Sequence, residues 1–170
     1  YVDSLLAICE AEKVDLLIPL FEPEFLLLDA RRFEFARINT CLLLSEYRVI
    51  ETCSDKFKTY QFFIDHGIKT PYTWLPEALP EMITYPLFIK PRSGMGSQGA
   101  QKVESGEQLQ FILQHAVDFL IQDYIPGKEY TLDILADLEG QVLSVVPRER
   151  LEVRAGEVSK SRTLYRSDLI

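Results

Sequence analysis

Three glycines in residues 88–103, FIKPRSGMGSQGAQKV, are spaced as G-x-G-x-x-G. Gly94, Gly96 and Gly99 have no side chain that would keep a phosphate away from the backbone N–H groups around them. The same spacing occurs in the dinucleotide turn of Rossmann folds, in loops that cover ATP, and in turns that are only flexible. The residues around the glycines therefore have to decide between these three uses.

The flanking sequence argues against two nucleotide-binding folds. A Rossmann turn opens a helix directly after a strand, but residues 90–93 intervene here, and the segment after Gly99 is short and strand-like. A P-loop requires Gly-Lys-Ser/Thr after the glycines, and this sequence lacks it. We expect the loop to join two strands of a hairpin. Lys90 ends the first strand, where its ammonium could reach a phosphate, although such lysines more commonly lie along a surface.

The composition is that of a folded acidic protein. The 170 residues are 47% hydrophobic and carry a formal net charge of −8, which argues against nucleic acid as the main partner. No apolar run has the length of a membrane-spanning helix and no signal peptide is visible, so we expect a cytoplasmic protein without a membrane partner. Cys9, Cys41 and Cys53 show no metal-binding or disulfide pattern and are expected to be reduced and mostly buried.

The first 70 residues alternate between helical and strand-like patterns. Helices are predicted at residues 3–13, 22–39 and 55–66, and short buried strands at 14–20 and 40–45. Asp3 and Ser54 are candidate caps of the first and third helices, while Asn39 and Gly67 are candidate ends of the second and third. This order of elements is typical of an α/β fold with a parallel sheet.

The second half of the chain is richer in strands. Five prolines lie between residues 70 and 91, so residues 70–85 are expected to have little regular structure. Strands are predicted at residues 85–90, 119–125, 129–137, 140–153 and 157–165, with one helix at 104–116. Leu109, Ile112 and Leu113 would share one face of that helix. Turns at Gly140 and Gly156 favour antiparallel sheets here.

Two segments resemble the ATP-grasp superfamily, and within it the carbamoyl-phosphate synthase large-subunit-like group. They are YPLFIKPRSGMGSQG (85–99) and LIQDYIPGKEYTLDIL (120–135), with similar upstream stretches in VDLLIPL and SDKFKTYQFFIDHGIKTPYT. The resemblance implies an α/β (α+β) fold, in which residues 1–54 end a parallel-sheet pre-ATP-grasp domain. Residues 55–170 would then begin an ATP-grasp domain with antiparallel sheets. It would contain a lid subdomain at about 72–121 and the truncated start of a C-terminal subdomain at 122–170.

The resemblance also implies roles in ATP binding, position by position. Lys56 and Lys90 match the two basic positions that hold the phosphates. The loop that closes over the phosphates is matched by Ser93, Gly94, Met95, Gly96, Ser97 and Gly99. The strand that frames adenine is matched by Gln122, Asp123, Tyr124 and Ile125. Glu129 matches the acid that accepts from the ribose hydroxyls, and Asp133 has a counterpart that faces the cleft.

A local excess of basic residues follows Pro147, where six bases stand against four acids. Such a stretch suits a small anionic ligand and equally a solvated strand face. We hypothesise that Arg148, Arg150, Lys160 and Arg162 help to hold the acceptor carboxylate or the transferring phosphoryl group. The resemblance further implies Mg²⁺ (or Mn²⁺) beside ATP. The metal ligands of the family lie in a later segment, so no metal ligand is expected within this chain.

The chemistry implied by the family is that of an ATP-dependent ligase. It would join a small-molecule carboxylate to an amine or ammonia through an acylphosphate, with positioning and charge stabilisation as the work of the protein. We expect this chain to be a fragment that is inactive alone, and we name no catalytic residue in it. Family enzymes are often dimers, so a homodimer is expected. The alternative is a non-catalytic regulatory or degenerate nucleotide-binding module. A nicotinamide oxidoreductase, the third hypothesis, requires a helix that starts between Gly96 and Gly99.

Overall fold

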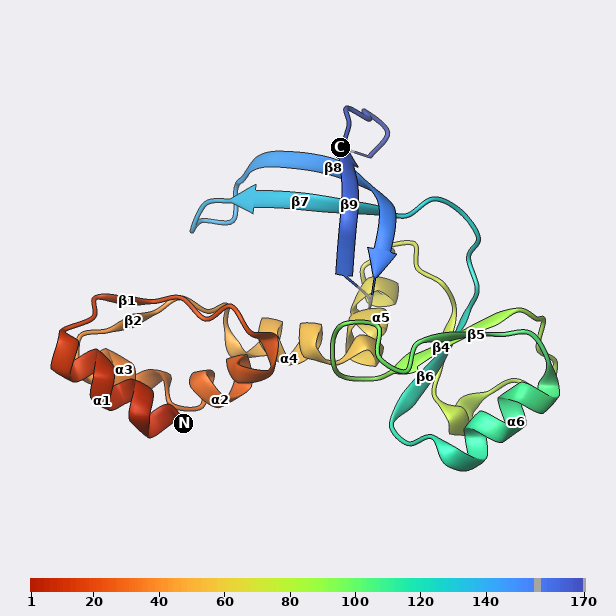
Figure 1. Cartoon of the computed structure of the whole chain (residues 1–170), viewed down its shortest axis with the longest axis horizontal. Helices are drawn as coiled ribbons and strands as arrows, with labels where there is room; N and C mark the ends of the chain where they lie inside the picture. Colours follow the sequence, from red (N-terminus) through yellow and green to blue (C-terminus); the bar gives the residue numbers. More distant parts are fainter. Residues whose placement is uncertain (155–156, 170) are drawn as a thin grey trace. The chain divides into compact units, whose positions relative to one another are not determined.

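The computed structural model describes residues 1–154 and 157–169 (Figure 1). The chain divides into two compact units. Unit 1 comprises Tyr1–Thr73 together with Arg92–Gly94, and unit 2 comprises Trp74–Pro91 and the chain from Met95 onward. The turn predicted at Gly156 lies outside the described residues.

Unit 1 alternates helices with two short strands, as the α/β prediction requires. Its elements are α1 (Val2–Glu12), β1 (Leu16–Leu17), η1 (Glu22–Glu24), α2 (Phe25–Asp29), α3 (Arg32–Arg37), β2 (Cys41–Leu42), α4 (Tyr47–Ser54) and α5 (Lys56–Asp65). The strands β1 and β2 are parallel, and Leu16 opposes Cys41 in their ladder. Helices α1 and α3 lie beside these strands (Figure 1). The core under the strands consists of Cys9, Leu28, Phe35 and Leu42.

The strands of unit 1 are shorter and more exposed than predicted. Only two residues of the run 14–20 are paired, and Ile18 and Leu20 are 52% and 90% exposed. Among the described residues β1 and β2 pair only with each other, so no further ladder extends or covers them. The prediction for the cysteines was also wrong in part, because Cys9 is buried whereas Cys41 and Cys53 are exposed; all three thiols are free.

Several helix ends differ from the prediction. Tyr1, not Asp3, is the N-cap of α1, and Asp3 lies in the first turn. The helix predicted at 22–39 is interrupted between α2 and α3. There Arg32 pairs with Asp29 at 2.7 Å and donates to the carbonyl of Leu44, which ties the new helix start to the chain after β2. Leu44 is 12 residues from Arg32, so helical periodicity does not reveal the break.

Ser54 does not cap α5, because it is the last residue of α4, a helix that the sequence pattern did not predict. The cap is Asp55, whose side chain accepts from the backbone N–H groups of the first turn. The predicted helix ends are confirmed: Asn39 and Gly67 have φ angles of 61° and 66°, in the left-handed region that ends helices.

Unit 2 contains two antiparallel sheets, as predicted (Figure 1). The first has the strand order β3-β6-β4-β5, and the second β7-β8-β9. Their elements are β3 (Thr73–Trp74), η2 (Pro76–Ala78), β4 (Leu87–Pro91), β5 (Gln101–Val103), α6 (Gly106–His115), β6 (Phe119–Asp123), β7 (Tyr130–Ala136), β8 (Val142–Arg154) and β9 (Glu157–Thr163). The expectation of little regular structure at 70–85 holds, apart from β3 and η2.

The four-stranded sheet packs one face against α6. Ser105 caps this helix and accepts from the N–H of Gln108. As predicted, Leu109 and Ile112 face inward, whereas Leu113 is 38% exposed. The resulting core consists of Leu87, Ile89, Val103, Leu109, Ile112, Phe119 and Ile121. Burying each side chain of this size contributes about 1.5–3 kcal/mol, so this core stabilises the sheet strongly.

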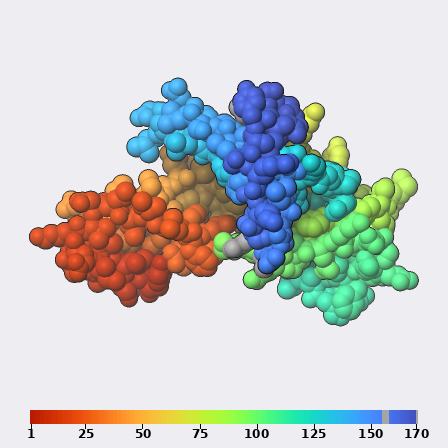
Figure 2. All heavy atoms as spheres, turned by 45° about the horizontal axis from the view of Figure 1, so that its top comes forward, coloured from red at the N-terminus to blue at the C-terminus, as the bar shows by residue number. Residues whose placement is uncertain are grey.

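The three-stranded sheet has little apolar burial. In the ladder of β7 and β8, Tyr130 opposes Glu149 and Ile134 opposes Val145. Ile134 and Leu143 are both 60% exposed. Side chains of β8 and β9 form part of the blue surface in Figure 2. This sheet therefore depends on its backbone ladder and on the polar contacts of its side chains.

Candidate nucleotide site

The glycine segment is the loop of a hairpin, as predicted. β4 and β5 pair antiparallel, with Leu87 opposite Val103. Gly94, Gly96 and Gly99 have φ angles of 93°, 71° and 72°, and none of the residues between them is helical. The hypothesis of a nicotinamide oxidoreductase is therefore wrong, because no helix begins at these glycines.

Gly99 also lies close to Pro91. A Cβ at this position would lie 3.2 Å from Cγ of Pro91, and the φ angle of 72° disfavours any side chain. The loop residues Ser93 and Met95 are exposed, and Ser97 adopts a φ of 53°. The loop thus has the backbone freedom that the sequence pattern predicted.

Lys56, the first residue of α5, contacts the start of this loop. Its Nζ donates to the carbonyl oxygen of Gly94 at 2.7 Å. Its backbone N–H donates to the carbonyl oxygen of Arg92 at 3.0 Å. Two of the predicted phosphate-binding elements are therefore brought together by the structure, although they are far apart in sequence.

Asp55 and Arg92, which the sequence analysis did not single out, hold this arrangement. Asp55 Oδ1 accepts from the N–H groups of Phe57 at 2.9 Å and Lys58 at 3.2 Å. The same carboxylate accepts hydrogen bonds from Arg92. Nε of Arg92 lies 3.0 Å from Oδ1 and 2.9 Å from Oδ2, and Nη2 lies 2.7 Å from Oδ2. The Arg92 guanidinium lies 5.9 Å from the ring centre of Phe57. A signal was present for Asp55, which directly precedes a helix and is a preferred N-cap residue.

The electrostatic environment of Asp55 favours its charged form. Burial acts to raise the pKa of the carboxyl, but the hydrogen bond from Arg92 and those from the backbone of Lys58 and Phe57 lower it by more. The net pKa lies below its usual value. The carboxylate is therefore ionised at neutral pH and available to both partners.

Lys90 and Gln122 lie on one face of the four-stranded sheet. Leu87 and Ile89 of β4 are buried on the α6 side, so the alternating Phe88 and Lys90 lie on the other side. In the ladders Phe88 opposes Gln122 of β6, which places Gln122 on the same side as Lys90. Both side chains are half-buried.

Lys102 extends the same face. It opposes Phe88 in the ladder of β4 and β5, and its Nζ lies 5.0 Å from the ring centre of Tyr124. The strand predicted at 119–125 ends earlier, at Asp123, three residues before Pro126, which has no N–H to donate to a ladder. Tyr124 and Ile125 follow the strand, and Ile125 is 66% exposed.

Glu129, Asp133, Arg148 and Arg150 share one face of the three-stranded sheet. Arg148 holds both oxygens of Asp133, at 2.8 and 3.1 Å. The hydrogen bond from Arg148 lowers the pKa of the Asp133 carboxyl. Glu129 Oε2 lies 3.4 Å from Nε of Arg150, and the Arg150 N–H donates to the Glu129 carbonyl at 2.9 Å.

Arg162 lies on the opposite face of that sheet, because it is directly opposite Glu149 in the ladder. Glu149 is 6% exposed and binds Lys128 Nζ at 2.9 Å and Arg162 Nη2 at 2.5 Å. Lys128 first, and then Arg162, lower the pKa of the Glu149 carboxyl. Lys160 opposes Glu152 where the register is irregular. The structure therefore does not gather the four cations on one face, and sequence reasoning missed Glu149.

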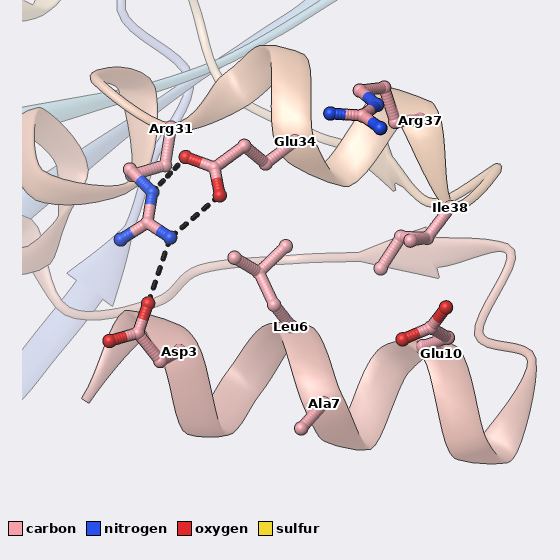
Figure 3. Close-up of a pocket in the computed structure, with 8 residues that line it drawn as sticks. All are labelled: Asp3, Leu6, Ala7, Glu10, Arg31, Glu34, Arg37 and Ile38. Carbon is pink, nitrogen blue, oxygen red and sulfur yellow. Dashed lines mark hydrogen bonds and ion pairs between the residues drawn. The ribbon is translucent and has the colours of Figure 1, made fainter.

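A separate groove of about 500 Å³ lies in unit 1 between α1 and α3 (Figure 3). It is lined by Asp3, Leu6, Ala7, Glu10, Arg31, Glu34, Arg37 and Ile38. Arg31 joins its two sides through Asp3, at 2.8 Å, and Glu34. None of the predicted nucleotide-binding residues belongs to this lining, so the groove is distinct from the candidate site.

Metal-binding groups and membrane-spanning helices bear on the wider function. Within residues 1–154 and 157–169 no group of three or more His, Cys, Asp or Glu side chains is placed to hold a metal ion. In the same part of the chain, every helix is too short or too polar to span a bilayer.

Comparison with known sequences finds relatives of both halves of the chain. Residues 53–170 match the ATP-grasp domain, and residues 1–43 match the PylC-like N-terminal domain. The vancomycin/teicoplanin A-type resistance protein VanA of Enterococcus faecium is 30% identical over 108 residues, covering 59% of this chain and 32% of the relative. The arginine-specific carbamoyl phosphate synthase large chain of Bacillus subtilis is 28% identical over 164 residues, covering 91% of this chain and 16% of the relative.

Solved structures show the same fold at lower identity. An L-amino acid ligase from Bacillus licheniformis has a TM-score of 0.65 at 20% identity, covering 88% of this chain and 36% of the ligase. The biotin carboxylase domain of Hydrogenobacter thermophilus 2-oxoglutarate carboxylase, solved with MgADP, has a TM-score of 0.70 at 16% identity, covering 92% of this chain and 38% of that one. The chain spans about a third of the length of several curated relatives that it matches.

Proposed function

The chain belongs to the ATP-grasp family, and we propose that it is the ATP-binding portion of a ligase that joins a carboxylate to an amine or ammonia. Several relatives are named as ligases of this kind, among them the D-alanine–D-alanine ligase of Gloeobacter violaceus. We propose that the first domain ends at residue 54 and the second begins at residue 55, with the lid at about 72–121. We also propose that the protein is a cytoplasmic homodimer.

The contact between Lys56 and the glycine loop is the main support for nucleotide binding. A cation at the N-terminus of a helix and a loop with three left-handed glycines together offer an ammonium and backbone N–H groups to an anion. In the proposal Lys56 and Lys90 hold the phosphates and the loop covers them. Gln122–Ile125 frame the adenine, and Glu129 accepts from the ribose hydroxyls.

In the proposed reaction, a substrate carboxylate oxygen attacks the γ-phosphorus of ATP and ADP leaves. The amine or ammonia then attacks the acylphosphate carbon and displaces phosphate. The side chains of this protein position the reactants and stabilise charge, and the loop excludes water from the acylphosphate. Arg148 and Arg150 share a sheet face with Glu129, which makes them better candidates for binding an anionic group there than Arg162.

We propose Mg²⁺ (or Mn²⁺) as the ion that accompanies the nucleotide, since the Hydrogenobacter thermophilus structure was determined with MgADP. A divalent ion offsets the charge of the phosphates. The described residues contain no group suited to hold it, so we assign no metal ligand and no catalytic step to this chain's acids.

Protection of lysines from an amine-modifying reagent tests the nucleotide site. ATP is expected to slow the labelling of Lys56 and Lys90, whereas the exposed Lys69, four residues after the end of α5, serves as the control. Equal labelling of Lys56 and Lys90 with and without ATP would contradict the assignment. Adenosine, which lacks phosphates, is expected to protect neither lysine.

The alternative function is a nucleotide-binding module without turnover. Lys56, Lys90 and Glu129 are all present in the sequence, and they support ATP binding equally well under either function. Incubating the longest natural form of the protein with ATP, Mg²⁺ and candidate carboxylates and amines distinguishes the two. Substrate-dependent release of ADP supports the ligase, and ATP binding without such release supports the binding module.

A further inference from the structure

We propose that Asp55 and Arg92 are positioning residues that fasten the start of the glycine loop to the N-terminus of α5, so that Lys56 and the loop bind phosphate as one unit. The inference rests on the proposed nucleotide binding for its functional part. We call the group formed by Asp55, Lys56, Arg92 and Gly94 the loop clamp.

The carboxylate of Asp55 binds two elements, the N-terminus of α5 and the start of the glycine loop. Asp55 caps α5 through the N–H groups of Phe57 and Lys58 and binds Arg92 through both oxygens. Bidentate arginine–carboxylate pairs fix geometry more tightly than single contacts. The side chains of Asp55 and Arg92 are only 19% and 33% exposed, so water screens their interaction less than it screens a surface pair.

The backbone of the loop also contacts the N-terminus of α5. The first N–H groups of a helix have no acceptor within the helix, and most are satisfied by caps or water. Here the N–H of Lys56 donates to the carbonyl of Arg92 at 3.0 Å. The chain entering the loop thus acts as part of the cap of α5, and the loop cannot shift at Arg92 without exposing this N–H.

The Lys56 ammonium lies against the start of the glycine loop. It donates to the carbonyl oxygen of Gly94, two residues beyond Arg92, at 2.7 Å. A neutral carbonyl is a weaker acceptor for an ammonium than a charged phosphate oxygen. We therefore infer that a phosphate replaces Gly94 as the acceptor while Arg92 stays bound to Asp55. Without the clamp, phosphate binding would have to order the start of the loop first, which reduces affinity.

The competing explanation is an ion pair that only stabilises the fold. Two variants separate the possibilities. Arg92→Gln removes the bidentate pair, and Asp55→Asn also removes it but keeps an amide oxygen that can cap the helix. Lys58→Met is the matched control, because Lys58 lies on α5 like Lys56, and the change breaks an ion pair with Glu51 of α4, in which Nζ and Oε1 are 2.8 Å apart.

Amide hydrogen exchange measured by NMR tests the clamp without nucleotide. In Arg92→Gln the N–H of Lys56 is expected to exchange about tenfold faster, which corresponds to the weakening of one charge-assisted contact. The N–H groups of Phe57 and Lys58 should change much less, since Asp55 still caps them. Unchanged exchange at Lys56, or equal acceleration at all three residues, would overturn the clamp.

Titration calorimetry with Mg²⁺-ATP and with adenosine tests the functional part. Arg92→Gln and Asp55→Asn are each expected to weaken ATP binding about tenfold, the double variant no more than either single one, and Lys58→Met not at all. Adenosine affinity should stay unchanged in every variant, which a general loss of folding would not allow. Additive losses, or equal losses for adenosine and ATP, would refute the positioning role.

The two experiments also separate this inference from the proposed function. If the unaltered chain binds no ATP, the proposed function fails and the positioning role fails with it. The exchange rate of the Lys56 N–H then still decides whether the clamp exists. If the chain binds ATP normally and the variants do too, the proposed function stands and the positioning role is refuted.

Discussion

The two antiparallel sheets of this chain are stabilised in different ways. In the four-stranded sheet, the inward side chains of the central strands form an apolar layer, in which Leu87 and Ile121 are 0% exposed. In the three-stranded sheet the most buried charged residue is an acid, Glu149, held between two cations. Ile134, on the same face of that sheet as Glu149, is 60% exposed.

The two sheets therefore support their polar side chains in different ways. An apolar core of packed side chains tolerates little change in volume, so the four-stranded sheet gives Lys90 and Gln122 a rigid support. The three-stranded sheet carries ion pairs on both faces, and such partners can be exchanged for a charged ligand at a smaller cost than a packed core side chain can be moved. Substitutions matched between the two sheets test this contrast.

The largest effect is expected from a truncation in the apolar layer. Ile121→Ala in β6 leaves a cavity and should lower the free energy of unfolding by about 2–5 kcal/mol. The same change in the other sheet, Ile134→Ala in β7, should cost less than about 1 kcal/mol, because most of that side chain is already in water. Urea unfolding followed by circular dichroism measures both. Similar losses for the two variants would remove the contrast between the sheets.

A smaller, pH-dependent effect is expected from Glu149→Gln. The pKa of Glu149 is lowered in the folded chain, first by Lys128 and then by Arg162. Its charge therefore stabilises the fold fully above the ordinary glutamate pKa of about 4.3, and this contribution is lost as the pH falls through the lowered value. The variant should have a lower urea midpoint than the unaltered chain at pH 7.

The difference between the two midpoints should shrink as the pH falls below about 4.3, where the glutamate of the unfolded chain is protonated first, and should vanish below the lowered pKa of Glu149 in the folded chain. Glu152→Gln is the control on the same strand, since the pair of Glu152 with Arg154 is more exposed and should matter less. A midpoint difference that stays constant from pH 7 to the acid range would show that the charge of Glu149 is not what stabilises this sheet.

Local sequence patterns predicted the elements that carry the site. The positive φ angles of the glycine loop, the inward face of α6 and the antiparallel second half all follow from residues that are close in sequence. The strand predicted at 14–20 was too long, because an apolar run does not show how many neighbours a strand has. Helix α4 was missed, although its apolar and polar residues follow a clear helical period.

Contacts between distant residues decided the rest of the site. Asp55 and Arg92 are separated by 37 positions, so no local pattern joins them. In the sequence, the bases after Pro147 form one cluster. In the structure, a strand places alternate residues on opposite faces, and the register of β8 and β9 decides which residues of β9 share a face with each of them. The pairing of Arg162 with Glu149 separates Arg162 from Arg148, and the irregular register near Glu152 could not be read from the sequence.

The smallest difference between the two sheets is expected at their hairpin turns, one in each sheet. Gly99 and Gly140 have φ angles of 72° and 84°, so alanine at either position costs about 1–2 kcal/mol for its left-handed backbone. A Cβ at Gly140 meets no atom within 4 Å, whereas one at Gly99 would lie 3.2 Å from Pro91. Gly99→Ala should therefore destabilise the chain more than Gly140→Ala, as measured by thermal unfolding. Equal destabilisation would mean that Pro91 moves away from the added Cβ at little cost. The end of the glycine loop would then be held less firmly than the packed four-stranded sheet that carries it.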